Sequence, residues 1–575
     1  MRYPIISEIK ESKEMTNAFK GYVHTATVPD GAFFDLKNIT TDDYPVMSTR
    51  KNRGFVREFT NLQGMIDKDG LVIVDDGRLF INGEEKEISL SNEGRKSITK
   101  MGAFLVIFPD KVWYNTKDNT YGNLEASSEI EGTVALTLCN ANGQAITWHD
   151  ASYYQSHSPS EGDYMMTTTN GKTSLKTYSS ATGMWVSVAT TYFKIEATDL
   201  GKDFEKGDGV KITIDPTGWD YSKNIFVNEE DGKRNSNFVV FDKGDNFITV
   251  PGLLDNNRNL SYIKVERKTP DIAYVIECMN RLWACSKDGH EIYCCKLGDV
   301  KNWNCFSGIS TDSWAATVGS DGEWTGAFAY MGYPTFFKDD SITRVVISSQ
   351  GAHQARDIAC KGIQKGSENS LCMVNETLFY KSDNCVCAYD GQFPVSISEP
   401  LGDINYKNAV AGAIGNKYYI SMESKNGISN FVYSNGLWTK EDSLKIDFFA
   451  RVDQELYFAS DNKLYTAYGS EGDVEKDFKW MAETGPIGYQ SSDRKNLSRV
   501  NIRMVLPMKS YCVLYAQYDS SGDWEAVWQM NGKSNQAFAV PMKPHRCDHF
   551  KLRIEGRGEA KVYGIIRSYT EGSDI

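Results

Sequence analysis

The chain has 575 residues, of which 41% are hydrophobic and 12% are aromatic. This length exceeds that of one ordinary domain, so we expect two to four domains with packed cores. The formal net charge of −13 excludes a general affinity of the whole chain for nucleic acid.

The chain also lacks the marks of a membrane or secreted protein. No run approaches the roughly 18 apolar residues that a bilayer span needs, and residues 1–15 lack the apolar stretch of a secretory signal. We therefore expect synthesis in a cytosol. The twelve cysteines fall mostly in strand-like segments, so we interpret them as reduced, buried, small apolar side chains.

Residues 1–62 show no clean periodicity. Short apolar or aromatic anchors alternate with turn residues, which is typical of an arm that lies on another surface and builds no core of its own. We therefore expect that a chain without residues 1–50 would still fold. The alternative is a first blade of a larger fold with irregular loops. The anchors are Asn17–Gly21, Asp30–Phe34, Asn38–Thr40 and Tyr44–Arg50.

From Gly64 the chain becomes regular. Residues 71–74 and 78–83 predict a strand, a turn and a second strand, and residues 103–108 and 111–114 repeat the unit. Residues 126–264 change character: short β-branched or alternating runs are bounded by Gly and Asp, with no helical period. This stretch predicts an inserted all-β domain.

The regular units resume near Tyr274. In the stretch Glu277–Phe306, an apolar strand at 281–284 precedes a tight turn at Ser286–Gly289 and a returning strand at 291–295, since Asp-Gly supplies positive φ. A spacing of roughly 40–50 residues is typical of four-stranded propeller blades, and a series of stacked β-sandwiches is the alternative. Further units lie at Gly332–Val345, Asn375–Asp390, Gly415–Trp438 and Asp453–Tyr468.

Residues 479–575 predict a separate β-sandwich. Val500, Ile502 and Met504 alternate with arginines, and Phe550 and Leu552 begin a second alternating strand. From residue 491 onward, 13 Lys and Arg face 9 Asp and Glu, although the chain as a whole is acidic. A basic module on an acidic body favours contact with an acidic neighbour, and ordinary surface variation is the alternative.

Several of these stretches resemble one family. The unit at Glu277–Phe306 resembles the blades of β-propeller tail proteins of short-tailed phages, of the nozzle or tail-hub type. The closer resemblance is to a structural protein of prophages in Gram-positive gut bacteria, often labelled a stabilisation protein. The same resemblance extends to Phe-Lys-Gly-Tyr at 19–22, Asp-Gly-Ala-Phe at 30–33, Asn-Ile-Thr at 38–40, residues 44–50, and Trp480–Tyr489 with Asp493–Lys495 and Leu497–Val500.

Motif and resemblance together predict an all-β chain with four parts. These are an extended N-terminal arm at 1–62, a β-propeller at 63–125 and 265–478, an inserted all-β domain at 126–264, and a C-terminal β-sandwich at 479–575. The resemblance implies a structural component of a tailed-phage virion, in the tail or the head–tail connection, that forms a ring around the DNA channel. The virion would be its location, after synthesis in the bacterial cytoplasm.

The implied partners are portal, adaptor or tail proteins and further copies of the chain, while genome DNA passes an acidic wall without specific binding. We expect no membrane span and no cofactor. The candidate protein-contact residues are Phe19, Tyr44, Arg50, Arg494, Lys495, Arg499 and Arg503. The alternative function is a glycan-binding or glycan-degrading tail protein on a propeller scaffold, with recognition by Trp- and Tyr-lined loops of the insertion.

No motif predicts catalysis or a metal site. His545, Cys547 and His549 would share one solvated strand face, but ligands spread about 6–7 Å apart are too far from one another for one zinc ion. Cys294 and Cys295 point to opposite sides. Cys385 and Cys387 share a face without zinc-finger spacing. We interpret the loop carboxylates as turn formers and expect no enzyme activity; they are Asp288, Asp299, Asp312, Asp321, Asp339, Asp340, Asp383 and Asp390.

Overall fold

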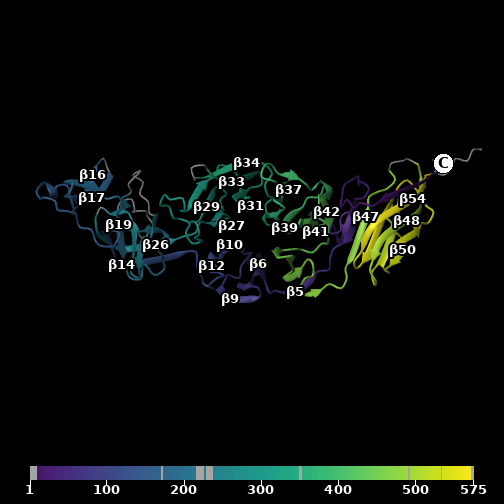
Figure 1. Cartoon of the computed structure of the whole chain (residues 1–575), viewed down its shortest axis with the longest axis horizontal. Helices are drawn as coiled ribbons and strands as arrows, with labels where there is room; N and C mark the ends of the chain where they lie inside the picture. Colours follow the sequence, from purple (N-terminus) through teal and green to yellow (C-terminus); the bar gives the residue numbers. More distant parts are fainter. Residues whose placement is uncertain are drawn as a thin grey trace, which may run out of the picture. The chain divides into compact units, whose positions relative to one another are not determined.

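The computed structural model describes residues 10–169, 172–214, 226–227, 237–254, 256–348, 352–489, 493–532 and 534–571. The chain is all-β, as predicted (Figure 1). Its contacts divide it into two compact units, residues 1–95 with 337–342 and 358–575, and residues 96–336 with 343–357. The described 3-10 turns are η1 (Tyr153–Gln155), η3 (Glu368–Ser370) and η4 (Glu399–Leu401).

Four-stranded antiparallel sheets, each made of consecutive strands, recur along the described chain and are the blades of a β-propeller. Those in the first unit are β6 (Leu62–Asp67), β7 (Leu71–Asp75), β8 (Arg78–Ile81) and β9 (Glu84–Ser89); β35 (Cys372–Val374), β36 (Thr377–Lys381), β37 (Val386–Tyr389) and β38 (Val395–Ser396); and β39 (Lys407–Ile414), β40 (Lys417–Ser424), β41 (Gly427–Ser434) and β42 (Leu437–Lys440). The other sheets are β10 (Ser97–Met101), β11 (Phe104–Phe108), β12 (Val112–Asn115) and β13 (Tyr121–Asn123); β27 (Ile272–Glu277), β28 (Leu282–Ser286), β29 (Glu291–Cys294) and β30 (Trp314–Thr317); and β31 (Gly326–Tyr330), β32 (Tyr333–Phe337), β33 (Ser341–Ile347) and β34 (His353–Ala359).

The hairpins inside the blades follow the predicted turn chemistry. Between β28 and β29, Gly289 has φ +86°, and the Asp288 carboxylate accepts hydrogen bonds from the Ser286 hydroxyl and from the His290 N–H. A side chain at Gly289 would also meet the carbonyl oxygen of Gly322 at 2.5 Å. Glycine is therefore required here by both the turn and the close backbone approach.

One further blade takes a strand from the N-terminal segment. β43 (Phe448–Val452), β44 (Glu455–Ser460) and β45 (Lys463–Thr466) continue into β5 (Gly54–Glu58), which also pairs with β46 (Asp473–Val474). Residues 54–58 therefore belong to the propeller, and the predicted arm of residues 1–62 extends too far. Its pairing partner lies some 400 residues away, so no local pattern marks this strand.

The second unit contains the inserted β structure. Its larger sheet has the order β22-β20-β26-β14-β19-β24-β23 and packs around Leu136, Phe193 and Ile263. A smaller sheet has the order β15-β16-β17-β18, in which β15 and β16 are parallel. The bounds are β14 (Ala126–Cys139), β15 (Trp148–Asp150), β16 (Tyr164–Thr169), β17 (Lys172–Ser179), β18 (Met184–Ser187), β19 (Tyr192–Glu196), β20 (Gly209–Thr213), β22 (Asn237–Val239), β23 (Asp242–Gly244), β24 (Phe247–Pro251) and β26 (Arg258–Arg267), with a separate pair β21 (Phe226–Val227) and β25 (Leu253–Leu254).

The first unit ends in a β-sandwich of two sheets. One has the order β3-β4-β54-β48-β51, with β1 on β54 and β52 on β48, and the other has the order β2-β47-β53-β49-β50. The N-terminal members are β1 (Lys10–Thr16), β2 (Phe33–Lys37), β3 (Ile39–Thr40) and β4 (Met47–Thr49). The C-terminal members are β47 (Lys479–Thr484), β48 (Lys495–Leu506), β49 (Tyr511–Tyr518), β50 (Glu525–Asn531), β51 (Ser534–Pro541), β52 (Arg546–Cys547), β53 (Phe550–Arg557) and β54 (Lys561–Glu571).

The N-terminal segment is therefore part of this sandwich, and the prediction of an arm without a core of its own chain is wrong. β1 pairs along its whole length with β54, from Lys10 opposite Glu571 to Thr16 opposite Ile565. In Figure 1 the purple N-terminal segment lies against the yellow C-terminal strands. Phe19, Phe33 and Leu36 belong to the same buried cluster as Leu514 and Ile554. The anchors read from the sequence are real, and the surface that they anchor to is the chain's own C-terminal sandwich.

Candidate functional site

Three of the seven predicted contact residues are buried inside the chain. Phe19 is 3% exposed, Arg50 is 6% exposed and Lys495 is 1% exposed. The guanidinium of Arg50 donates to Glu475 Oε2 at 2.8 Å and to Asn38 Oδ1 at 2.8 Å, and the ammonium of Lys495 donates to the carbonyls of Asp493 and Asp548. These side chains therefore hold the chain together and offer nothing to a neighbouring molecule.

The other four are exposed. Tyr44 is 50% exposed, and Arg494 lies at the entry to β48. Arg499 and Arg503 point outward from β48, whose alternate residues Val500, Ile502 and Met504 are buried. Within the described residues, the three arginines have no ion pair or hydrogen bond from their side chains. Besides the hydrogen bond with His549, the charge of Arg494 helps to lower the pKa of Asp548, while Arg499 and Arg503 leave unpaired positive charge on the outer side of this sheet. The role of the three arginines as a contact remains a prediction.

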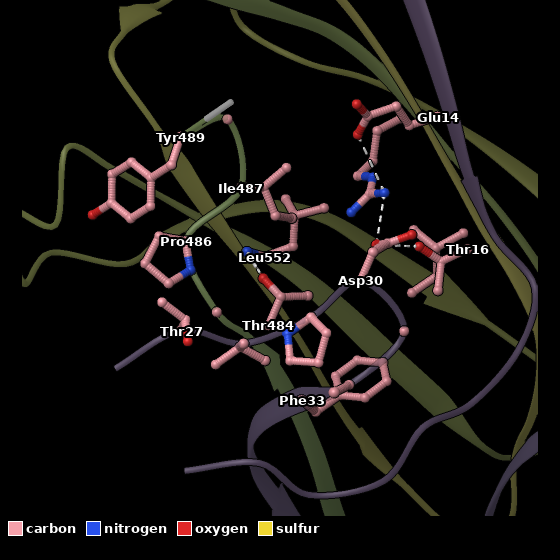
Figure 2. A pocket seen from close by; sticks show the side chains of 18 of the residues that line it. Glu14, Thr16, Thr27, Asp30, Phe33, Thr484, Pro486, Ile487, Tyr489 and Leu552 are labelled. Carbon is pink, nitrogen blue, oxygen red and sulfur yellow. Dashed lines mark hydrogen bonds and ion pairs between the residues drawn. The ribbon is translucent and has the colours of Figure 1, made fainter. Parts of the chain in front are cut away.

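A pocket of about 780 Å³ opens in the sandwich between the loop at 26–33 and the segment at 484–489 (Figure 2). Asp30 and Gly31 form the turn that shapes one wall. Gly31 has φ +89°, and a side chain there would meet the carbonyl oxygen of Ala18 at 2.5 Å. At Gly485 a side chain would meet Val28 at 2.5 Å, so Gly485 permits the close approach of the two walls, while Gly31 lets the loop at 26–33 pack against Ala18.

Arg567 of β54 and Lys495 of β48 are basic side chains in the lining of this pocket. Arg567 is 4% exposed, and its Nη2 atom lies 2.9 Å from Asp30 Oδ1 and 3.4 Å from Glu14 Oε2. The Tyr569 hydroxyl donates to the other oxygen of Glu14 at 2.6 Å, and the Thr16 hydroxyl donates to Asp30 Oδ1 at 2.8 Å. Burial alone would raise the pKa of Asp30, but the Arg567 charge and the two hydrogen bonds hold this pKa below its ordinary value.

This geometry does not equip the pocket for glycoside hydrolysis. A general acid must keep its proton near neutral pH, which requires a raised carboxyl pKa. The pKa of Asp30 is lowered, and both oxygens of Glu14 have donors. The arrangement is suited to binding, since its polar groups are held in place by one another.

The sequence pointed to parts of this pocket without revealing it. The Asp30–Gly31 turn and the stretch Trp480–Tyr489 stood out as motifs, and they contribute two of its walls. Glu14 and Arg567 carried no local pattern, because they meet only through the pairing of β1 with β54, where they lie directly opposite each other.

The other candidate groups are structural in the described residues. Asp299, Asp312 and Asp390 accept backbone hydrogen bonds within their own turns, as expected of turn formers. All twelve cysteines are free thiols and ten are buried. No group of three potential metal ligands occurs in the part of the chain that the structure describes.

The face predicted for His545, Cys547 and His549 needs a correction. Cys547 is fully buried rather than solvated, because β52 pairs with the start of β48 and brings Cys547 opposite Lys495. His549 lies beyond this short strand, and its ring nitrogens contact the Ser520 hydroxyl at 2.6 Å and Asp548 Oδ2 at 3.0 Å.

The insertion carries a separate group of partly exposed rings beside its smaller sheet. Tyr153 is stacked between His149, at 3.8 Å between ring centroids, and His157, at 4.0 Å. Tyr154 contacts Trp185 at 4.7 Å. These are the Trp and Tyr side chains on which the glycan-recognition alternative depends, and much of their ring surface is taken up by one another.

Comparisons with known proteins do not assign the chain to a family. No family model and no curated protein matches it. Among solved structures, Hsv2 of Kluyveromyces marxianus has 12% identity and a TM-score of 0.24, and the match covers 36% of this chain and 64% of that one, less than two thirds of its length. An exo-β-1,3-galactanase of Phanerochaete chrysosporium has 10% identity, a TM-score of 0.22 and coverages of 52% and 96%. BBS1N in complex with ARL6DN has 9% identity, a TM-score of 0.23 and coverages of 73% and 95%.

These TM-scores are too low to support any functional argument. The description as a β-propeller with a sandwich therefore depends on the strand order of the chain itself. Separately, the described residues contain no helix of the length and apolar character that crossing a bilayer demands.

Proposed function

We propose that the chain is a structural component of a tailed-phage virion, in the tail or the head–tail connection, where it acts through protein–protein contacts. The observation that carries this proposal is the exposed positive charge on β48. The side chains of Arg494, Arg499 and Arg503 form no ion pair or hydrogen bond among the described residues, on a chain whose net charge is −13. Such charge is suited to an acidic neighbour, such as another copy or an adjoining virion protein.

The rest of the chain agrees with an assembly role. A propeller and a sandwich built from both chain ends are rigid elements for a ring, and an acidic body repels DNA phosphate, so that a genome can slide past it. The proposal includes no catalytic step. The degrading form of the glycan alternative has no support in the pocket, where the carboxylates are engaged by Arg567.

Mass spectrometry of purified particles tests the proposal. Tailed particles released by the bacterium that carries the gene should contain peptides of this chain in a constant ratio to a portal or tail protein. Genes for portal and capsid proteins should lie nearby. A chain that is abundant in the lysate and missing from particles purified by density gradient would overturn the proposed function.

A further inference from the structure

The pocket between residues 26–33 and 484–489 has the size and form of a ligand site. Its volume of about 780 Å³ falls within the roughly 300–1,000 Å³ that is usual for small-molecule pockets. Its walls combine apolar side chains such as Pro486, Ile487 and Leu552 with a few fixed polar groups (Figure 2). A folding role alone does not account for polar groups that retain unused hydrogen-bonding capacity in such a space.

Arg567 supplies an unused donor. Its Nη2 atom is held by Asp30 and Glu14, whereas neither its Nη1 nor its Nε has a hydrogen-bond partner in the described residues, and of these two Nε is fully buried and Nη1 is not. An arginine that is 96% buried is costly to leave with an unmet donor, so an acceptor from a bound molecule would stabilise the site.

Asp30 supplies an unused acceptor. Its Oδ1 atom takes the hydrogen bonds from Thr16 and Arg567, while its Oδ2 atom takes none of those that the structure describes. The donor and the acceptor belong to two side chains that are bonded to each other, so one small ligand can reach both.

The charges at this point select the ligand class. Two basic side chains, Arg567 and Lys495, and two carboxylates, Asp30 and Glu14, line the pocket, so their charges balance and a phosphate or carboxylate gains no net attraction. A hydroxyl group is neutral and both donates and accepts, so adjacent hydroxyls can bond Asp30 and Arg567 together. A sugar carries such pairs of hydroxyls.

An aromatic ring completes the pattern. Tyr489 is 62% exposed at the pocket (Figure 2), where it contacts His549 with 4.6 Å between ring centroids. Figure 2 shows Tyr489 across the pocket from Asp30, so its ring can pack against the C–H face of a saccharide whose hydroxyls reach the charged side chains on the other side.

From these observations we infer that the sandwich pocket binds a neutral saccharide through Asp30, Arg567 and Tyr489. This inference goes beyond the assembly role and stands or falls independently of it, because saccharide binding is measured on the purified chain and virion incorporation is measured on particles.

Saturation-transfer NMR on the full-length protein tests the inference. The probes are glucose, galactose, mannose, rhamnose and N-acetylglucosamine, with glucuronate and inorganic phosphate as anionic comparisons. We expect at least one neutral sugar to receive saturation and the anions to receive none. Tyr489→Ala and Asp30→Asn should each weaken the binding of that sugar roughly tenfold or more, since each removes one of few anchors.

Matched variants locate the site. Trp528→Ala removes another half-exposed ring of the sandwich, on β50 outside the pocket, and should leave binding unchanged. Trp185→Ala tests the ring group of the insertion. The inference is overturned if no neutral sugar receives saturation, if the anions bind better, or if Trp185→Ala abolishes binding and Tyr489→Ala does not. Because Tyr489 is largely exposed, its loss leaves the fold intact and this outcome readable.

Discussion

Arg53 makes a buried charge contact that ties the N-terminal segment to a blade. Its guanidinium lies 2.6 Å from Glu441 Oε2 and 2.5 Å from Asp442 Oδ2, with side chains that are 9%, 9% and 14% exposed. It also lies over the ring of Phe458, at 4.9 Å. Glu441 and Asp442 follow β42 directly, so their contact with Arg53 fixes the position at which β5 enters the last blade.

Replacing Arg53 by Met should therefore destabilise the first unit by about 3–5 kcal/mol, because two buried carboxylates lose their counter-charge. Arg57→Met is the matched control. Arg57 is half-buried, has no ion pair in the described residues and packs on Phe59, so its loss should cost less than about 1 kcal/mol. Urea unfolding measures both, and equal losses would show that the carboxylates at 441 and 442 do not depend on Arg53.

The same contact predicts a pH dependence. Burial alone would raise the pKa of Asp442, but the Arg53 charge and hydrogen bonds from Asn430 and Leu444 hold this pKa below its ordinary value. A lowered folded pKa means that the ionised form stabilises the fold above the unfolded pKa of about 3.9, and that this contribution is lost as pH falls through the folded value.

In Asp442→Asn, the melting temperature should fall near neutral pH and depend less on pH below about 4 than in the unaltered protein. Thermal scans from neutral to acidic pH give the comparison. Parallel curves for the two proteins would mean that other carboxylates cause the acid sensitivity of this unit.

At the scale of elements, the sequence predicted the hairpins, in which neighbouring strands pair with each other. The hairpins β7–β8, β28–β29 and β40–β41 pair neighbours across turns of two to four residues, and turn residues such as Gly77 and Gly289 have the positive φ that such turns need. Strands β1 to β5 were missed as parts of the sandwich and the last blade. They are two to seven residues long. β1, β2, β4 and β5 pair with strands hundreds of residues away and β3 pairs with β4, so their order comes from tertiary contacts that no periodicity encodes.

The prediction of candidate site residues was limited in the same way, because contacts between distant segments leave no local pattern. Tyr489 and Asp30 lie in stretches that resembled a family, and Arg499 and Arg503 were identified correctly as the polar face of a strand. Lys495 was expected just before that strand as a contact residue, but its ammonium turns back to the carbonyls of Asp493 and Asp548. Arg567 carried no local pattern, and only its pairing with β1 gives it a role.

Deleting residues 1–50 should now give the opposite of the result expected from sequence. The truncated chain loses β1 to β4 and uncovers the buried cluster around Leu514 and Ile554, so we expect aggregation or strong binding of a hydrophobic dye. Adding residues 10–50 as a separate peptide should restore part of the solubility. A truncated chain with an unchanged circular-dichroism spectrum and melting temperature would restore the view of this segment as a detachable arm.

At the scale of the whole molecule, charge is distributed unevenly along the chain. Residues 491–575 carry 13 basic against 9 acidic side chains, while the total is −13, so the remainder is strongly acidic. Many other cations are matched within the chain, as Arg553 is by Glu483 and Arg557 by Asp477, but those at the outer side of β48 are not. Unmatched charge of one sign on a regular strand is what an assembly contact would use.

Changing Arg494, Arg499 and Arg503 together to Glu should therefore reduce incorporation into particles. A single exposed ion pair contributes only about 0–1 kcal/mol, so one change should do little, whereas three changes repeated in every copy of a ring act together. The matched control changes Lys407, Lys425 and Arg451 to Glu, which alters net charge equally on exposed positions of the blades. Lys495 is left intact, because its burial would confuse a lost contact with a lost fold.

Incorporation of the unaltered chain should also decline as assembly is carried out at higher ionic strength, because salt screens exposed charge. Equal incorporation of both triple variants at low and high salt would exclude the arginines of β48 as the contact and would direct the search to the exposed apolar side chains.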